Sequence, residues 1–165
     1  DNEKTLDITD LRNEYEKNIP IWDPDNLISS ELLSVGSVII DEFYDQHVDK
    51  KLNIYEKEMS FNFIIGIYRI IGFIDRVDLI GDRVHITDYK TGKWEATQKD
   101  IHNNLQLGIY ALAMHNIFPE KEVYAELYYL RSGKKKGHLF SLDDIENVKV
   151  RILKAADKFI KENTN

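Results

Sequence analysis

The sequence predicts an α/β fold, in which helices flank a mixed central β-sheet made of a three-strand meander and two further strands. Apolar residues recur at helical spacing up to about residue 47, and from Tyr55 they alternate with polar residues, as in a half-buried strand. A tight Gly81-Asp82 turn then divides a long apolar stretch into two strands, as in a hairpin. The resulting order of helix, three strands, helix, two strands and helix indicates a sheet covered by helices.

The first 28 residues are polar and are expected to form a peripheral segment. A helix is predicted near residues 8–17, followed by a Pro-bounded loop over residues 19–26. The next helix begins after a cap at Ser29 or Ser30 and ends near His47. Its apolar positions follow helical spacing: Leu32, Leu33, Val35, Ile39, Ile40, Phe43 and Tyr44.

Three strands follow, of which the first begins at Tyr55 and turns at Gly66. The second is predicted over residues 69–80 and the third over residues 83–90. The alternation in the first strand places Tyr55, Met59, Phe61 and Phe63 against Glu56, Glu58, Ser60 and Asn62.

The C-terminal half begins with a polar loop and a helix over residues 101–117, which stops before Pro119. A strand over residues 123–131 turns through residues 132–137 and returns over residues 138–141. These two strands complete the predicted sheet.

A final amphipathic helix is predicted from the spacing of Ser141 and Asp144, which is that of a capping box. The apolar residues on this helix share one face: Ile145, Val148, Ile152, Ala156 and Phe159.

Length and composition set the class of protein. A chain of 165 residues with 42% apolar residues is expected to form one globular domain over residues 1–165 with a sizeable core. It begins at Asp1 without a Met or a signal peptide, so we expect it to be a piece of a longer protein or a trimmed chain. No run of about 18 apolar residues is present, which excludes a membrane span.

The cysteine content and the net charge limit the kinds of metal site and of nucleic-acid binding that this chain can have. The absence of cysteine excludes disulfides, thiolate zinc sites and iron–sulfur clusters within this segment, and it is compatible with a cytoplasmic location. The net charge of -7 argues against binding nucleic acid through a broad basic face. It still allows an enzyme that reaches phosphates through metal ions and one basic patch.

Asp75, Asp88 and Lys90 form the candidate catalytic group. Because the Gly81-Asp82 turn lies midway between Asp75 and Asp88, the hairpin register puts these carboxylates opposite each other. Adjacent carboxylates repel unless a proton or a cation separates them, and their hard oxygens suit Mg²⁺ or Mn²⁺. Lys90, on the same strand face as Asp88, would orient or deprotonate water, or offset charge in the transition state. The alternative is an ordinary Asp–Lys salt bridge on a solvated sheet face.

Three motifs in this order carry a family resemblance: Gly72-Phe73-Ile74-Asp75-Arg76-Val77-Asp78, Asp88-Tyr89-Lys90-Thr91-Gly92-Lys93, and Gln106-Leu107-x-x-Tyr110. Residues 56–131 resemble the RecB-like branch of the PD-(D/E)XK nuclease superfamily, which includes CRISPR-associated exonucleases.

The resemblance implies a restriction-endonuclease-like core and a role for each matching residue. Asp75, Asp88 and the backbone carbonyl of Tyr89 would hold the metal, and Lys90 would be the catalytic lysine. The residues expected to contact DNA or support the site are Gln106, Tyr110, Arg76 and Lys93. Asp78 belongs to the same motif as Arg76 and either has a role there or pairs with a basic neighbour.

The sequence departs from the family pattern in two places. Relatives carry a His in the first helix, in a pattern like Gly-x-x-x-His, and the matching stretch from Gly36 has Ile40 there. Either Asp41 or Glu42 substitutes as a ligand, or that metal contact is missing. Several helicase-linked and CRISPR-associated relatives also hold an iron–sulfur cluster, for which this segment has no cysteines.

Other polar residues have two open interpretations each. Glu56 or Glu58 is a supporting acid or a solvent-facing residue, and Lys134-Lys135-Lys136 is a solvated turn or a DNA-steering patch. Trp94 stacks on an unpaired base or covers the sheet edge. His47, His85, His102, His115 and His138 show no paired metal spacing; His85 is expected at the surface, and His102 near DNA or in solvent.

The sequence therefore predicts a divalent-metal-dependent DNA nuclease, and the resemblance favours an exonuclease in recombination, repair or phage DNA processing. Its expected partners are single- or double-stranded DNA with a free end, and a fused or associated helicase or recombination protein. One alternative is a catalytically degenerate nuclease-like module that binds DNA or acts as a scaffold. Another is a regulatory interaction domain with a salt-bridged sheet.

Overall fold

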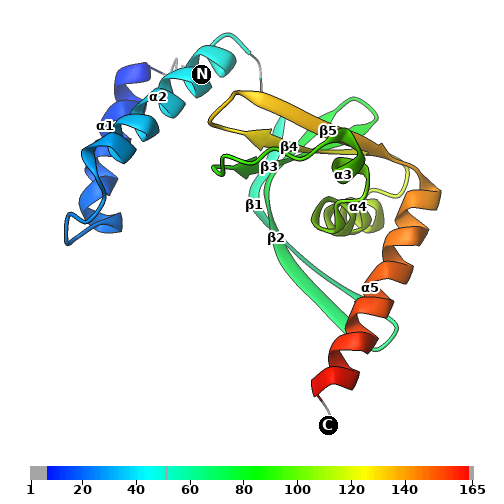
Figure 1. The fold of residues 1–165 in the computed structure, drawn as a ribbon. Helices are drawn as coiled ribbons and strands as arrows, with labels where there is room; N and C mark the ends of the chain where they lie inside the picture. Colours follow the sequence, from blue (N-terminus) through cyan, green and yellow to red (C-terminus); the bar gives the residue numbers. More distant parts are fainter. Residues whose placement is uncertain (1–6, 51, 164–165) are drawn as a thin grey trace. The chain divides into compact units, whose positions relative to one another are not determined.

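The computed structural model describes residues 7–50 and 52–163, and the chain divides after residue 51 into two compact units. The first unit contains α1 (Ile8–Trp22) and α2 (Ser30–His47), and the second contains the β-sheet and three helices (Figure 1). The expectation of one domain over the whole chain stays a prediction.

The helix α1 is longer than predicted. It continues through Pro20 to Trp22, where a loop was expected from residue 19. Pro20 lies in the last turn and has no N–H to donate to the carbonyl four residues before it, so the helix lacks one backbone hydrogen bond there. The backbone N–H of Asp23 still closes this turn on the carbonyl of Ile19 at 2.8 Å.

The helix α2 begins at the predicted cap, because the Ser29 side chain accepts the backbone N–H of Leu32. Tyr15 of α1 holds the two helices of the first unit together. Its hydroxyl donates to the carbonyl of Leu33 at 3.1 Å. The ring fills the space beside Gly36, where an added Cβ would lie 2.1 Å from the Tyr15 hydroxyl.

The second unit is built on a five-stranded mixed sheet, as predicted. The strands lie in the order β1 to β5, and only β3 and β4 run parallel to each other. Their bounds are β1 (Ile54–Ile65), β2 (Tyr68–Ile80), β3 (Arg83–Lys90), β4 (Glu122–Tyr129) and β5 (Lys134–Phe140). This α/β architecture confirms the predicted restriction-endonuclease-like fold.

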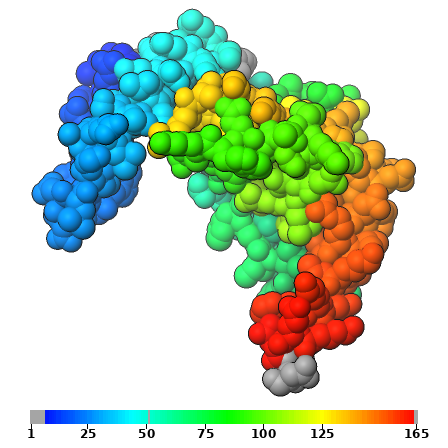
Figure 2. Space-filling model, viewed as in Figure 1, coloured from blue at the N-terminus to red at the C-terminus, as the bar shows by residue number. Residues whose placement is uncertain are grey.

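Three helices pack on this sheet: α3 (Gln98–His102), α4 (Leu105–Ile117) and α5 (Leu142–Asn163). The first two form the crossover between the parallel strands β3 and β4. Helix α4 packs against β1, β3 and β4, while α3 and α5 contact β5 (Figure 1). The α5 helix lies along the surface of the second unit (Figure 2). Fully buried side chains join α3 and α4 to the sheet: Val84, Ile86, Ile101, Leu107, Ala111 and Met114.

The single helix predicted over residues 101–117 is instead two helices. A capping box of Thr97 and Asp100 begins α3, and Asn104 begins α4 by accepting the backbone N–H of Leu107 at 3.0 Å. Asn side chains compete with helical backbone bonds, so the Asn103-Asn104 pair separates the helices. The break leaves Gln106 in the first turn of α4.

The strand β5 begins earlier than predicted, at Lys134 rather than at residue 138. Gly133 adopts the left-handed backbone conformation (φ 66°), so the turn closes within residues 130–133 and Lys134 already pairs with Tyr129. An edge strand tolerates lysines, which discourage pairing with another sheet. The predicted Ser141 and Asp144 capping box is present at the start of α5.

The strand β1 departs from the predicted alternation in its first half. Its register shifts between Ile54 and Glu56, and Glu58 has a positive φ of 50°. Tyr55, Glu56 and Glu58 are exposed, and buried residues alternate only from Met59 onward. Neither glutamate is buried as a supporting acid would be.

No helix in the part of the chain that the structure describes combines the length and the apolarity that a membrane span needs.

Candidate active site

The β2–β3 hairpin brings Asp75 and Asp88 to its open end. Arg76 pairs with Thr87 and Ile80 with Arg83, which is the predicted register, so Asp75 and Asp88 occupy the next position on each strand. There the Asp75 carboxylate accepts the backbone N–H of Tyr89 at 2.8 Å. At the end of the β2–β3 pairing, the Asp75 side chain thus accepts the Tyr89 N–H in place of a backbone carbonyl of β2.

Asp88 is a buried carboxylate of the hairpin, with only 3% of the residue exposed. Within residues 7–50 and 52–163, no donor hydrogen-bonds its buried Oδ2 atom. Lys90 Nζ lies 2.5 Å from this oxygen and forms an ion pair without hydrogen-bond geometry. Burial raises the pKa of Asp88, Lys90 opposes the rise, and the charge of Asp75 adds to it. A cation beside Asp88 Oδ2 would relieve this cost.

Lys90 is held between the sheet and α4. Its Nζ donates to Gln106 Oε1 at 3.0 Å, and Gln106 Nε2 donates to the Tyr110 hydroxyl at 2.8 Å. Gln106 and Tyr110 meet because they lie four residues apart on one helix. Burial raises the pKa of Tyr110, and the charges of Asp88 and Asp75 add to the rise. The structure therefore brings together five of the predicted site residues.

Tyr110 is positioned by an aromatic contact across the sheet. Its ring meets that of Phe61 edge to face, with centroids 5.9 Å apart. Phe61 pairs with Gly72 on β2, where an added Cβ would lie 2.6 Å from the ring. The glycine of the first motif thus leaves room for the ring that supports Tyr110.

Arg76 is not part of this group. Its guanidinium binds both oxygens of Asp78 at 2.8 Å, and its side chain is only 13% exposed. The pairing of Asp78 with a basic neighbour is confirmed. The DNA contact expected of Arg76 stays a prediction, and its guanidinium is already paired with Asp78.

The candidate substitute ligands lie on α2. Asp41 accepts two hydrogen bonds from Arg12 of α1, at 2.9 and 2.8 Å, and Glu42 is exposed. Hydrogen bonding to Arg12 lowers the pKa of Asp41. Because both residues belong to the first unit, a role for either at the metal stays a prediction.

The loop after β3 is anchored at both ends by contacts that sequence reasoning missed. Arg131 donates to the carbonyl of Thr91 at 2.6 Å, the Tyr129 hydroxyl accepts the backbone N–H of Ala96 at 2.9 Å, and Lys136 donates to the Ala96 carbonyl at 2.9 Å. Between these anchors Lys93 and Trp94 are exposed. The sequence signal is position, since Tyr129 ends the strand that pairs with β3 and Arg131 lies in the turn that follows it.

The lysine run lies on β5 and is engaged in ion pairs, rather than forming a solvated turn. Lys134 and Lys136 lie 3.4 and 3.2 Å from Glu95 oxygens. Lys135 lies 3.8 Å from Glu126, whose carboxylate also lies 3.2 Å from Nε2 of His85. His85 lies on a strand, as expected, and is partly exposed, because its ring packs beside the buried Glu126.

The donor set of the hairpin end fits a hard divalent cation. Among the described residues, Asp88 offers a buried carboxylate oxygen whose ion pair with Lys90 lacks hydrogen-bond geometry, and the charge of Asp75 acts on Asp88. Carboxylate oxygens with nearby room for water and phosphate oxygens are what Mg²⁺ and Mn²⁺ prefer.

The family model of the PD-(D/E)XK nuclease superfamily matches residues 3–163. The chain belongs to this superfamily. Its members are nucleases that act on DNA and generally use divalent metal ions, so the PD-(D/E)XK match agrees with the carboxylates and lysine at the hairpin end. It does not specify a branch.

Two solved structures are similar to this PD-(D/E)XK chain. One is described as a putative exonuclease from Eubacterium rectale, at 10% identity and a TM-score of 0.46, with 93% of this chain and 66% of that chain covered. The chain thus spans just under two thirds of that protein's length. The other is SSO0001, at 18% identity and a TM-score of 0.47, with 99% and 79% covered. No curated protein matches the chain.

Proposed function

We propose that this nuclease is divalent-metal-dependent and belongs to the RecB-like branch, with Asp75, Asp88 and the Tyr89 backbone carbonyl holding Mg²⁺ or Mn²⁺. The observation that carries the proposal is the buried Asp88 Oδ2, which forms an ion pair with Lys90 Nζ at 2.5 Å but no hydrogen bond of good geometry within residues 7–50 and 52–163. An ordinary structural salt bridge would satisfy its carboxylate with hydrogen bonds, as Asp78 and Arg76 do.

Lys90 is the catalytic lysine of the proposal. A bound metal polarises the phosphate and lowers the pKa of a water molecule. Lys90 Nζ, held by Asp88 and by Gln106, is placed to orient the attacking water and to offset negative charge on the phosphate. Gln106 and Tyr110 fix the direction of this ammonium group.

DNA contacts are proposed on both sides of this centre. Trp94 is 72% exposed on the anchored loop beside Lys93, which suits stacking on a base and pairing with a phosphate. A mostly apolar groove next to Gln106 and Tyr110 is walled by Phe73, which is 63% exposed. Aromatic surfaces of this kind bind unpaired bases, so we propose that a strand end enters here and that the enzyme is an exonuclease.

The second candidate is a degenerate nuclease-like module that binds DNA without cutting it. Ile40, in place of the family's histidine, favours this candidate. The intact group of Asp75, Asp88 and Lys90 opposes it. A role in recombination, repair or phage DNA processing, a helicase partner and a cytoplasmic location belong to the proposal on the resemblance alone.

Cleavage of end-labelled DNA tests the proposal. Linear single-stranded, linear double-stranded and circular DNA are incubated with Mn²⁺ or Mg²⁺, and with EDTA. We expect metal-dependent loss of linear DNA from its ends, intact circles, and no activity in Asp88→Asn. The matched control is Asp82→Asn in the exposed hairpin turn, which should cut like the wild type. Metal-independent cutting, or equal cutting by Asp88→Asn, would overturn the proposed centre, and cut circles would overturn the exonuclease assignment.

A further inference from the structure

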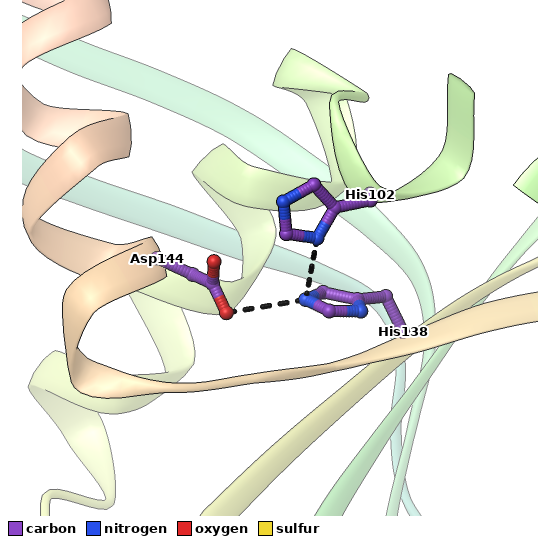
Figure 3. A group of neighbouring side chains, drawn as sticks. All are labelled: His102, His138 and Asp144. Atoms are coloured by element: carbon purple, nitrogen blue, oxygen red, sulfur yellow. Dashed lines mark hydrogen bonds and ion pairs between the residues drawn. The ribbon is translucent and has the colours of Figure 1, made fainter. Parts of the chain in front are cut away.

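Three metal-ligating side chains converge away from the hairpin end. His102 ends α3, His138 lies on β5, and Asp144 lies in the first turn of α5 (Figure 3). His102 Nδ1 and His138 Nε2 are 3.1 Å apart, and His138 Nε2 and Asp144 Oδ2 are also 3.1 Å apart. One ligand atom from each residue lies within 4.8 Å of the other two.

Hydrogen bonds alone cannot satisfy both short contacts of this cluster of His102, His138 and Asp144. A neutral imidazole carries one N–H and one lone pair, and a carboxylate only accepts hydrogen bonds. His138 Nε2 therefore either shares one proton between Asp144 and His102, or points a lone pair at the carboxylate. In both cases one short contact lacks a hydrogen bond of its own. Three lone-pair-bearing atoms around a common point are the arrangement that a cation satisfies.

Two of the three separations between the ligand atoms are close to those of a tetrahedral zinc site, and the third lies within 4.8 Å. Nitrogens bound to one Zn²⁺ at about 2.0–2.1 Å lie roughly 3.3–3.4 Å apart. The two separations of 3.1 Å are within about 0.3 Å of this spacing. The two imidazole rings are almost perpendicular, at 86°, so their planes do not stack and their lone pairs can meet at one point.

The carboxylate is already held in place for this role. The backbone N–H and the hydroxyl of Ser141 donate to Asp144 Oδ2 at 2.9 and 2.7 Å, so a bound ion would replace one of these hydrogen bonds or use the other carboxylate oxygen. Such outer contacts orient a metal ligand. Burial acts against it, but the Ser141 hydrogen bonds and His138 lower the pKa of Asp144 below its ordinary value, which keeps it ionised. Its charge also offsets the positive end of the α5 dipole, which by itself would disfavour a cation.

We propose that His102, His138 and Asp144 bind a Zn²⁺ ion, with solvent as the fourth ligand. His102 is exposed, so the open side of the site faces water. The two imidazole nitrogens suit Zn²⁺ better than Mg²⁺, so this site takes a different metal from the hairpin end. The ion would tie α3, β5 and α5 together. Its ligand His102 is separated from the start of α4 by two residues. The zinc site shares no residue with the proposed nuclease centre and does not depend on it.

Calorimetric titration of the tag-free chain with Zn²⁺ tests the site. The Asp88→Asn background removes binding at the hairpin end, so that one class of site remains. We expect one Zn²⁺ per chain, with affinity reduced at least about tenfold by His102→Ala and by His138→Ala. The matched control is His115→Ala on α4, which lies outside the cluster and should bind like the background.

Thermal melting with and without Zn²⁺ gives a second readout that does not require activity. Zn²⁺ should raise the melting temperature of the background and of His115→Ala, but not of His102→Ala. Because His102 is exposed, His102→Ala should melt like the background without metal, so lost binding is not caused by unfolding. Zn²⁺ binding of unchanged affinity in both His102→Ala and His138→Ala would overturn the proposal, as would the absence of binding in the background.

Discussion

Replacing Asp88 by Asn separates a metal ligand from a structural ion pair. The substitution keeps the shape of the side chain and removes its charge. It gives up the ion pair with Lys90. Because the Lys90 side chain is 34% exposed, we expect this pair to contribute only about 0–1 kcal/mol to the free energy of unfolding. The substitution also removes the cost of a buried, incompletely satisfied charge, about 1–3 kcal/mol. The free energy of unfolding of the metal-free protein should therefore be unchanged or rise by up to about 3 kcal/mol.

The response to metal should change in the opposite way. Mn²⁺ at about 100 times its dissociation constant stabilises a folded protein by about 2.7 kcal/mol. For a chain of this length, each kcal/mol shifts the melting temperature by about 2–4 °C. The wild type should therefore melt about 5–11 °C higher with Mn²⁺ than with EDTA, and Asp88→Asn should show no rise.

The assay is thermal melting followed by circular dichroism, with Asp78→Asn as the matched control. Asp78 is as buried as Asp88, but Arg76 satisfies both of its oxygens. Breaking this pair should cost about 3 kcal/mol or more, while the Mn²⁺ response is kept. An unchanged Mn²⁺ response in Asp88→Asn, or a loss of stability like that of Asp78→Asn, would refute the metal-ligand interpretation.

Two further predictions concern packing around the site. Gly108→Ala would place a Cβ 2.6 Å from Val148 Cγ2, so it should destabilise the protein by about 1–2 kcal/mol in thermal melts despite a better helix propensity. Gly92→Ala, which meets no atom within 4 Å, is its control, and equal melting of the two variants would contradict the close helix contact. Tyr129→Phe leaves the buried backbone N–H of Ala96 without its partner and should cost about 1–3 kcal/mol in urea unfolding. A loss below about 0.5 kcal/mol would show that this bond does not anchor the loop.

Local rules were sufficient to predict the carboxylate pair. A two-residue turn at Gly81-Asp82 fixes the hairpin register, and the register fixes which residues face each other. Helical spacing likewise brought Gln106 and Tyr110 together. These relations depend on residues close in sequence, which is why the core of the site could be read from the chain.

Contacts between distant elements could not be predicted in this way. The sequence gives no sign that Tyr129 bonds Ala96, because the two meet only through the parallel pairing of β3 and β4. His102 and His138 are separated by 36 positions and show no metal spacing, yet the packing of α3 on β5 places them in contact. Only the tertiary structure reveals such groups.

The central claim is that the group of Asp75, Asp88 and Lys90 cuts DNA. The most direct test is the single-turnover rate of DNA cleavage by Lys90→Ala with Mn²⁺, beside a control variant, Lys99→Ala, at an exposed position on α3. Lys90→Ala should lower the rate by at least about 100-fold while the Mn²⁺-induced rise in melting temperature is kept, because the lysine acts on the phosphate and not as a ligand. Cleavage by Lys90→Ala at the rate of Lys99→Ala would contradict the account.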